Sequence, residues 1–363
     1  MPLPAPEVMV RQVQALAGDL EILPSAFGEQ LSALLPPAPA RLLRRVYLVG
    51  CGDSHFASHA AELAFQTLAG VQCQSLSALQ FSEYCAPGLG LALEPCWVVG
   101  ISASGGTPAV VKAIEQARSR GVFSIAVTAN APSALSQVAD VTLVVSVPSN
   151  ERSPGIRSYQ ASLLGLFLLA IRLGELREQH SAGPALALRG ELRALSELVA
   201  ATAAAWKSPC QELARELQGD PRVIVLGTGP SHGTALFSAA KLVEAAGISA
   251  LGQDVEEWWH VERFAYPLDM LLFVIAPSGR AHWRAAEIAS AALQRGRRVV
   301  SVSPAGARSL AAHAWRALTV EREVREEFSP LVYHVFAGYL AAYTATELGR
   351  GLFQSPAAQS PVA

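Results

Sequence analysis

The sequence contains very little lysine. Of its 28 basic residues only three are lysine, Lys112, Lys207 and Lys241, and the other 25 are arginine. Charged residues make up 16% of the 363 residues, and the formal net charge is -2. This balance excludes the strongly basic surface that nucleic acids and anionic membranes attract. We therefore expect small molecules or protein chains as partners, no nucleic acid and no membrane.

Cysteine and long hydrophobic runs are also scarce. The five cysteines show no CxxC spacing, and the chain starts without a signal peptide. We therefore expect reduced thiols, a cytoplasmic location and no metal site. The longest apolar stretch, Ala161–Ile171, is too short to span a bilayer and ends at Arg172, which predicts a buried helix.

The chain contains an internal duplication. RVYLVGCGDSH (45–55) and RVIVLGTGPSH (222–232) share Arg-Val, an apolar run and then Gly-x-Gly-x-Ser-His. At a similar separation, VVGISASG (98–105) matches FVIAPSG (273–279). The sequence is therefore read as two copies of one unit.

Each copy alternates short apolar segments with longer helical patterns. In the first copy we expect strands at 46–49, 97–101, 123–128 and 141–145, and helices at about 54–69 and 107–120. Continuous apolar strands separated by helices predict a parallel sheet that is covered on both faces. The expected fold class is α/β, with two tandem doubly wound, flavodoxin-like parallel-sheet domains.

The domain boundaries follow from the segments between these patterns. We expect a helical N-terminal segment at 1–40 that ends in a proline-rich turn, a first sheet domain at 41–180, a helical linker at 181–215, a second sheet domain at 216–350 and a loose tail at 351–363. A C-terminal helix is predicted after Glu327.

Two strand-to-helix turns in the first copy are suited to binding an anion. The GCGDS turn (50–54) and the SASGGT loop (102–107) combine glycines and hydroxyls with a helix N-terminus, where free N–H groups and the helix dipole bind phosphate. The alternative is that these hydroxyls only cap a helix. The second copy has APSGRAHW (276–283) and lacks counterparts of Ser102 and Thr107, which favours the anion site. GCGDSH is not a GxGxxG fingerprint, so a nucleotide-dependent enzyme is less favoured.

The GCGDS turn, the SASGGT loop and ERSPGIRSY (151–159) occur in the order in which the SIS (sugar isomerase) family carries its sugar-phosphate motifs. The sequence resembles this family over nearly its whole length, in particular the isomerase half of glucosamine-6-phosphate synthase and the stand-alone deaminases and deglycases. The resemblance implies that a sugar 6-phosphate is held by Gly52, Ser54, Ser102, Ser104, Gly105 and Thr107. Ala103 stands where the synthase has glutamine, and Arg157 stands at the family's Lys or Arg position.

The second copy provides candidate acid and base residues. Lys241 and Glu244 lie three residues apart on one helix face, which by itself indicates a surface ion pair. The segment KLVE resembles, however, the family's KLKE motif, and His260 follows Glu244 after the family's 16 residues. The resemblance implies that Glu244, beside Lys241, moves the proton between C1 and C2. It also implies that His260 is donated to the neighbouring subunit of a homodimer for ring opening, which suits a group that titrates near neutrality.

The residues around His260 raise further expectations. Trp258 and Trp259 replace smaller residues of the family, so we expect them to change the pocket wall. As apolar neighbours they would also raise the pKa of the catalytic carboxylate. Glu257 is the alternative candidate for the base.

Two features of the family's synthase are missing. The tail after Phe353 has no lysine for the Schiff base that the resemblance implies, and the chain begins Met1-Pro2, without an N-terminal cysteine nucleophile. Ketose transamination is therefore less expected, as is glutamine as the nitrogen source unless another chain supplies it.

The expected function is that of a phosphosugar aldose–ketose isomerase, deaminase or deglycase. Its substrate would be a 6-phosphorylated amino or keto sugar, such as glucosamine 6-phosphate or fructose 6-phosphate, and it would use no cofactor. The alternative is a non-catalytic phosphosugar sensor. A sensor would have no need of Lys241, Glu244 and His260.

Overall fold

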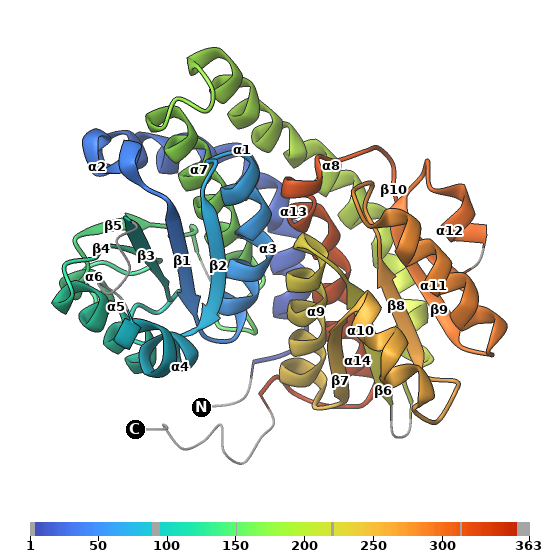
Figure 1. Cartoon of the computed structure of the whole chain (residues 1–363). Helices are drawn as coiled ribbons and strands as arrows, with labels where there is room; N and C mark the ends of the chain where they lie inside the picture. The colour runs from blue at the N-terminus through green and yellow to red at the C-terminus, as the bar shows by residue number, and fades with distance from the viewer. Residues whose placement is uncertain (1–3, 89–94, 150, 219–220, 313, 354–363) are drawn as a thin grey trace. The chain divides into compact units, whose positions relative to one another are not determined.

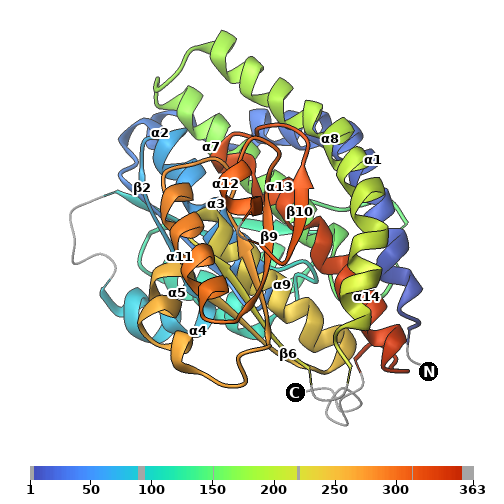
Figure 2. The same ribbon diagram turned by 90° about the vertical axis from the view of Figure 1, so that its right-hand side faces the viewer.

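The computed structural model describes residues 4–88, 95–149, 151–218, 221–312 and 314–353. The chain divides into two compact units, which we name after the sequence copies they contain. The first-copy unit comprises Gly18–Ser149 and Arg157–Ser196, and the second-copy unit comprises Met1–Ala17, Asn150–Ile156 and Glu197–Ala363. Each unit contains one five-stranded sheet with helices packed on it, as Figure 1 and Figure 2 show.

The sheet of the first-copy unit has the strand order β2-β1-β3-β4-β5, and its neighbouring strands are all parallel. Its strands are β1 (Arg45–Gly50), β2 (Gln72–Ser77), β3 (Cys96–Ile101), β4 (Phe123–Thr128) and β5 (Val141–Val144). Its helices are α2 (Pro37–Leu42), α3 (Asp53–Thr67), α4 (Ala78–Gln80), α5 (Pro108–Ser119), α6 (Ala134–Val138) and α7 (Arg157–Leu176), with short helical turns at Phe81–Cys85 and Ala86–Gly88.

The sheet of the second-copy unit has the order β10-β9-β8-β6-β7, which is the same topology read from the other edge. Its strands are β6 (Arg222–Gly227), β7 (Ser249–Asp254), β8 (Leu271–Ile275), β9 (Arg298–Pro304) and β10 (Arg316–Val320). Its helices are α9 (Pro230–Ala246), α10 (Val255–His260), α11 (His282–Gln294), α12 (Arg308–Ala312), α13 (Pro330–Tyr333) and α14 (Val335–Glu347), with short turns at Glu262–Phe264 and Glu326–Phe328. The fold is therefore α/β with two tandem doubly wound parallel sheets, as predicted.

Two long helices take part in both units by sequence. α1 (Glu7–Leu34) precedes the first sheet, and α8 (Ala182–Arg215) lies between the two sheets along the chain, where helical linkage was predicted. The proline-rich segment before β1 is more than a turn, because α2 begins at Pro37. Pro at the first helical position loses no intrahelical hydrogen bond and has a favourable φ.

The apolar helix α7 forms part of the core of the first-copy unit. By length and composition it is the one helix among the described residues that could cross a membrane, but 83% of its apolar window is buried. It packs closely on the sheet, since a Cβ at Gly165 would lie 2.7 Å from a methyl group of Val145. The predicted buried helix at Ala161–Ile171 is confirmed.

The two anion-binding candidates lie at the same edge of the first sheet. β1 and β3 are adjacent and parallel, with Val49 opposite Gly100. The GCGDS turn follows β1 directly and the SASGGT loop follows β3. In doubly wound sheets this carboxyl edge of the strands is where ligands bind.

Candidate functional site

The SASGGT loop is held together by its own hydroxyl groups. Ser102 is buried, and its Oγ accepts a hydrogen bond from the backbone N–H of Gly105 at 3.1 Å. The same oxygen lies 2.9 Å from Thr107 Oγ1 and 3.3 Å from Ser104 Oγ. Ser104 Oγ in turn accepts from the N–H of Gly106 at 3.2 Å. The three predicted hydroxyls are thus brought together in one small cluster.

The structure does not support a simple capping role for Thr107. Thr107 stands at the N-cap of α5, but its side chain accepts no capping hydrogen bond and instead bonds to Ser102. The next residue, Pro108, has no N–H to be satisfied. The hydroxyls therefore build the loop in front of the helix and do not neutralise its N-terminus, whose dipole stays available to an anion.

Gly105 has a conformation and a setting that only glycine fits. Its φ is +68°, in the left-handed region that favours glycine. A Cβ on this residue would lie 2.5 Å from Ser133 Cβ and 2.8 Å from Thr128 Oγ1. The segment that follows β4 therefore packs directly behind the loop.

The GCGDS turn has the same backbone in both copies. Gly52 has φ +53° and precedes α3, and its counterpart Gly229 has φ +57° and precedes α9. A Cβ on Gly50 would lie 2.7 Å from the carbonyl carbon of Ser54. These glycines let the strand turn sharply into the helix, and this places Ser54 in the first turn of α3. Binding of phosphate by Gly52 and Ser54 stays a prediction.

Arg157 has a structural partner in its own unit. Its guanidinium forms a bidentate ion pair with Asp19 of α1, with Nε–Oδ2 and Nη2–Oδ1 distances of 2.7 and 2.6 Å, and Nη1 donates to the carbonyl of Pro148 at 2.7 Å. Both charged side chains are at least 90% buried. This arrangement fixes the start of α7 against α1.

In the second-copy unit, Lys241 and Glu244 form an ion pair that is not a surface pair. Nζ of Lys241 lies 2.5 Å from Oε2 of Glu244, and the lysine side chain is 0% exposed whereas the glutamate is 36% exposed. The ammonium also lies 5.0 Å from the ring centre of Phe237, where a cation–π attraction adds to the pairing. A partly exposed carboxylate is thus held in place by a buried cation.

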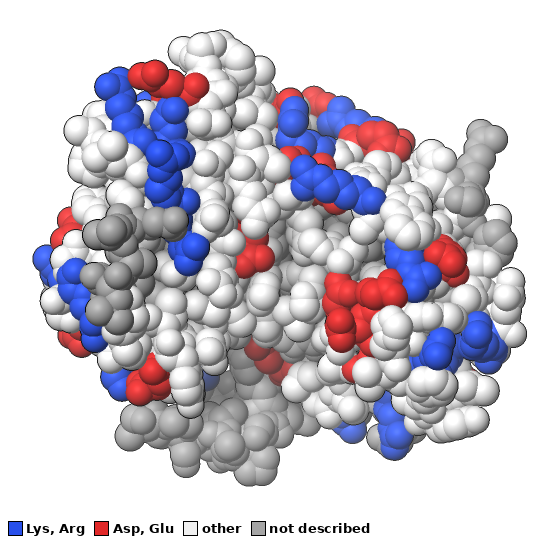
Figure 3. Space-filling model, viewed as in Figure 1, with Lys and Arg blue, Asp and Glu red and all other residues white. Residues whose placement is uncertain are grey.

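His260 is the last residue of α10 and its side chain is 66% exposed. Its Nε2 lies 3.2 Å from Oε1 of Glu256, one helical turn earlier. The hydrogen bonds from Arg284, with a smaller contribution from His260, lower the pKa of Glu256 to about 2. An ionised carboxylate therefore orients the imidazole, and Figure 3 shows acidic side chains gathered in the region of α10.

The tryptophans beside His260 do not have the predicted setting. Trp258 is 1% exposed and packs in the apolar core between α10, α11 and the sheet. Trp259 lies under the guanidinium groups of Arg263 and Arg295, at 4.5 and 4.9 Å from its ring centre. The expectation that Trp258 forms a pocket wall is wrong, because Trp258 lies on the face of α10 that packs against the core. Glu257, the alternative base, is exposed.

In the second copy, a side chain of the protein itself lies against the counterpart of the SASGGT loop. The backbone N–H of Arg280 donates to Oε1 of Glu326 at 3.2 Å, and a Cβ on Gly279 would collide with that carboxylate. Nδ1 of His282 lies 3.1 Å from the carbonyl oxygen of Ala276. An internal carboxylate thus occupies the position in front of α11 where the first copy has its cluster of hydroxyls.

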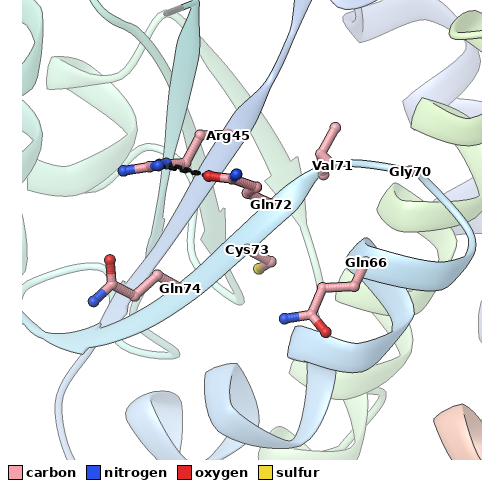
Figure 4. Close-up of a pocket in the computed structure, with 7 residues that line it drawn as sticks. All are labelled: Arg45, Gln66, Gly70, Val71, Gln72, Cys73 and Gln74. Carbon is pink, nitrogen blue, oxygen red and sulfur yellow. Dashed lines mark hydrogen bonds between the residues drawn. The ribbon is translucent and has the colours of Figure 1, made fainter. Parts of the chain in front are cut away.

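A separate cavity of about 660 Å³ lies at the opposite, amino end of β1 and β2 (Figure 4). It is lined by Arg45, Gln66, Gly70, Val71, Gln72, Cys73 and Gln74. Its charged member, Arg45, donates to Gln72 Oε1 at 3.1 and 2.5 Å, and its Nη1 lies 3.3 Å from the Tyr47 hydroxyl. This cavity has none of the predicted site residues. Within the described ranges, no group of three or more His, Cys, Asp or Glu side chains could hold a metal ion.

Comparisons with known proteins agree with the motifs. Residues 43–172 match the family model described as SIS domain. Glutamine–fructose-6-phosphate aminotransferase (isomerizing) of Pseudomonas aeruginosa is 26% identical over 275 residues, covering 75% of this chain and 43% of the relative. A protein of the same name from Bradyrhizobium diazoefficiens is 25% identical and covers 93% of this chain and 57% of the relative. The chain thus spans about half the length of these curated relatives.

Solved structures show the same fold over 96% of this chain. The C-terminal domain of glucosamine-fructose-6-phosphate aminotransferase from Francisella tularensis has a TM-score of 0.84 at 16% identity, and the match covers 96% of this chain and 98% of that one. Glucosamine-6-phosphate deaminase from Thermotoga maritima has a TM-score of 0.69 at 18% identity, with coverages of 96% and 97%.

Fold and sequence together define the class of this protein. It is a tandem parallel α/β protein whose residues 43–172 match the SIS domain model, and the resemblance to the SIS family predicted from the motifs is confirmed. The proteins it is similar to are named as isomerizing glutamine–fructose-6-phosphate aminotransferases and, among solved structures, a glucosamine-6-phosphate deaminase.

Proposed function

We propose that this chain is an enzyme that isomerises a 6-phosphorylated amino or keto sugar, with deamination or deglycation as the outcome for an amino-substituted substrate. The observation that carries the proposal is the combination of the clustered hydroxyls of the SASGGT loop with the buried Lys241–Glu244 ion pair. The first feature suits a phosphate and the second suits a proton transfer. The names of the relatives, which act on fructose 6-phosphate or glucosamine 6-phosphate, support the same substrate class.

The SASGGT loop would bind the sugar through its phosphate. Ser102, Ser104 and Thr107 offer hydroxyl donors, Gly105 offers close backbone approach, and α5 starts directly behind them. Gly52 and Ser54 would add the first turn of α3 from the neighbouring strand. Such contacts fix the position of the sugar and leave the chemistry to groups elsewhere.

Glu244 would carry the proton. In the open-chain aldose its carboxylate removes the proton from C2, and the resulting enediol or enolamine is protonated at C1 by the same group. With an amino group at C2, this gives a C2 imine that water hydrolyses to the ketose and ammonia. Lys241 holds the carboxylate in a fixed position, because its ammonium lies 2.5 Å away and is itself shielded from water.

His260 would open the sugar ring. Its exposed imidazole is held by Glu256 and would exchange a proton with a ring oxygen of the sugar. We further propose that the protein is a homodimer in which His260 serves the site of the neighbouring subunit. An exposed position at the end of α10 is compatible with such a donation.

The proposal is tested by binding and turnover with hexosamine, ketose and fructosamine 6-phosphates, following released ammonia or amine. Wild-type protein is expected to bind at least one of these compounds and to convert it. Glu244→Gln is expected to retain binding and to lose turnover by about 10²-fold or more, the scale of a lost general base. Full activity in this variant would exclude Glu244 as the base, and binding without turnover in the wild type would favour a sensor.

A further inference from the structure

The SASGGT loop is tied from behind by the segment 129–135, which follows β4. Three consecutive carbonyl groups of the loop accept hydrogen bonds from this segment. The Ala103 carbonyl accepts from the N–H of Ala129 at 3.1 Å, and the Gly105 carbonyl accepts from the N–H of Leu135 at 2.9 Å. The side chain of Asn130 reaches the carbonyl of Ser104, which lies between these two, and also that of Ala103.

Asn130 bridges two neighbouring peptide groups of the loop. Its Nδ2 donates to the carbonyls of Ala103 and Ser104, both at 3.2 Å. Both partners are acceptors, so the orientation of the amide follows from the hydrogen bonds themselves. The backbone N–H of Asn130 donates to Thr128 Oγ1 at 3.2 Å, and Thr128 is fully buried. The exposed asparagine is thereby anchored to the core of the sheet.

This arrangement sets the direction of the loop's peptide dipoles. A carbonyl oxygen that turned toward a bound phosphate would repel it, whereas an N–H group attracts it. Holding the oxygens of residues 103–105 toward the 129–135 segment keeps them away from the opposite side of the loop. The conformational entropy of these peptides is then lost when the protein folds, and binding of the ligand does not have to order them again.

The corresponding loop of the second copy is held in a different way. There the carbonyl of Pro277, the counterpart of Ala103, is approached at 3.2 Å by Nδ1 of His282, which belongs to α11 itself. The carboxylate of Glu326 lies in front of that helix. The side-chain bridge from behind occurs in the copy whose loop carries the three hydroxyls.

We infer that Asn130 is a positioning residue that presets the SASGGT loop for the substrate phosphate, without itself taking part in the proton transfer. The inference rests on the proposed function, because it assigns a phosphate to this loop. It adds a residue outside the sugar-phosphate motifs and predicts a specific kinetic signature. Loss of the bridge raises KM and leaves kcat unchanged, since phosphate binding is common to the ground state and the transition state.

The experiment compares wild type with Asn130→Ala and Asn130→Asp, the second of which keeps the shape and removes both donors. Amide hydrogen exchange of residues 104–107 is measured without ligand, and KM and kcat are measured on the phosphosugar that the wild type converts. Loss of two hydrogen bonds of ordinary strength corresponds to an increase of about thirtyfold in both exchange and KM, with kcat within about twofold.

Ser136→Ala is the matched control. It removes the capping box of α6, in which Ser136 Oγ accepts from the N–H of Ser133 at 2.7 Å, and it leaves the bridge intact. Exchange of residues 104–107 and KM should be unchanged in this control.

Each contrary result has a distinct meaning. Unchanged amide exchange of residues 104–107 in Asn130→Ala would show that Asn130 does not fix the conformation of the SASGGT loop. Raised exchange with unchanged KM overturns its link to the substrate. A wild type that binds no phosphosugar overturns the proposed function and with it the substrate role of Asn130, and the exchange data identify that case because they need no ligand.

Discussion

Replacing Gly105 by alanine tests whether the SASGGT loop is built around one conformation. The backbone of Gly105 has φ +68°, and the added methyl group would lie 2.5 Å from Ser133 Cβ and 2.8 Å from Thr128 Oγ1. The residue also donates to Ser102 at 3.1 Å and accepts from Leu135 at 2.9 Å. The variant therefore has to move the loop or the segment behind it.

The size of the effect follows from these contacts. A left-handed conformation costs about 1–2 kcal/mol for a residue with a Cβ. Overpacking against a buried neighbour adds about 1–3 kcal/mol. We expect Gly105→Ala to lower the free energy of unfolding of the first-copy unit by about 2–5 kcal/mol, or to shift the loop and weaken phosphosugar binding to a similar extent.

The neighbouring glycine provides the control. A Cβ on Gly106 meets only Ser104 Oγ, at 4.0 Å, so Gly106→Ala should change stability by no more than about 0.5 kcal/mol. Urea unfolding and titration with fructose 6-phosphate, on both variants and the wild type, measure the two effects. Equal behaviour of the Gly105 and Gly106 variants would refute the proposed loop geometry.

Two further predictions concern buried charge. Burial lowers the pKa of His334 from 6.5 to about 4. The folded protein therefore has its full stability above pH 6.5, where the ring is neutral in both states, and the free energy of unfolding falls by up to about 3 kcal/mol as the pH falls toward 4. In His334→Gln this part of the pH dependence, followed by urea unfolding, should disappear; an unchanged profile would contradict it. Asp19→Asn should lower the free energy of unfolding by about 3 kcal/mol, because it leaves the buried guanidinium of Arg157 without its counter-charge. A loss below about 0.5 kcal/mol would show that this pair is not buried in solution.

The central strands and the long helices could be predicted from the sequence because burial on both faces gives them continuous apolar runs. β1, β3 and β4 were found in this way, and so was the edge strand β5, which was predicted at 141–145. The edge strands β2, with sequence QCQSLS, and β7, with sequence SALGQD, were not found. Both are partly exposed and alternate polar with small residues, so they lack the pattern of a buried strand. The segment after Glu327 forms α13 and α14 and not one helix, and the tail beyond Phe353 lies outside the described residues.

The candidate site shows the same division between what local sequence determines and what packing determines. The importance of Ser102, Ser104 and Thr107 could be predicted, because the second copy keeps the same turn without counterparts of Ser102 and Thr107. The burial of Lys241 could not, because a three-residue spacing on a helix does not reveal which face packs inward. Asn130 was missed for a similar reason: it lies 26 residues after Ser104 in sequence and meets it only through the pairing of β3 with β4.

The most direct test of the central claim is solvent-deuterium exchange at C2 of glucosamine 6-phosphate or at C1 of fructose 6-phosphate. The wild type should catalyse incorporation of deuterium at C1 or C2, and Glu244→Gln should bind the sugar and incorporate none above background. Tight binding by the wild type without any exchange would contradict the assignment and identify the chain as a phosphosugar sensor.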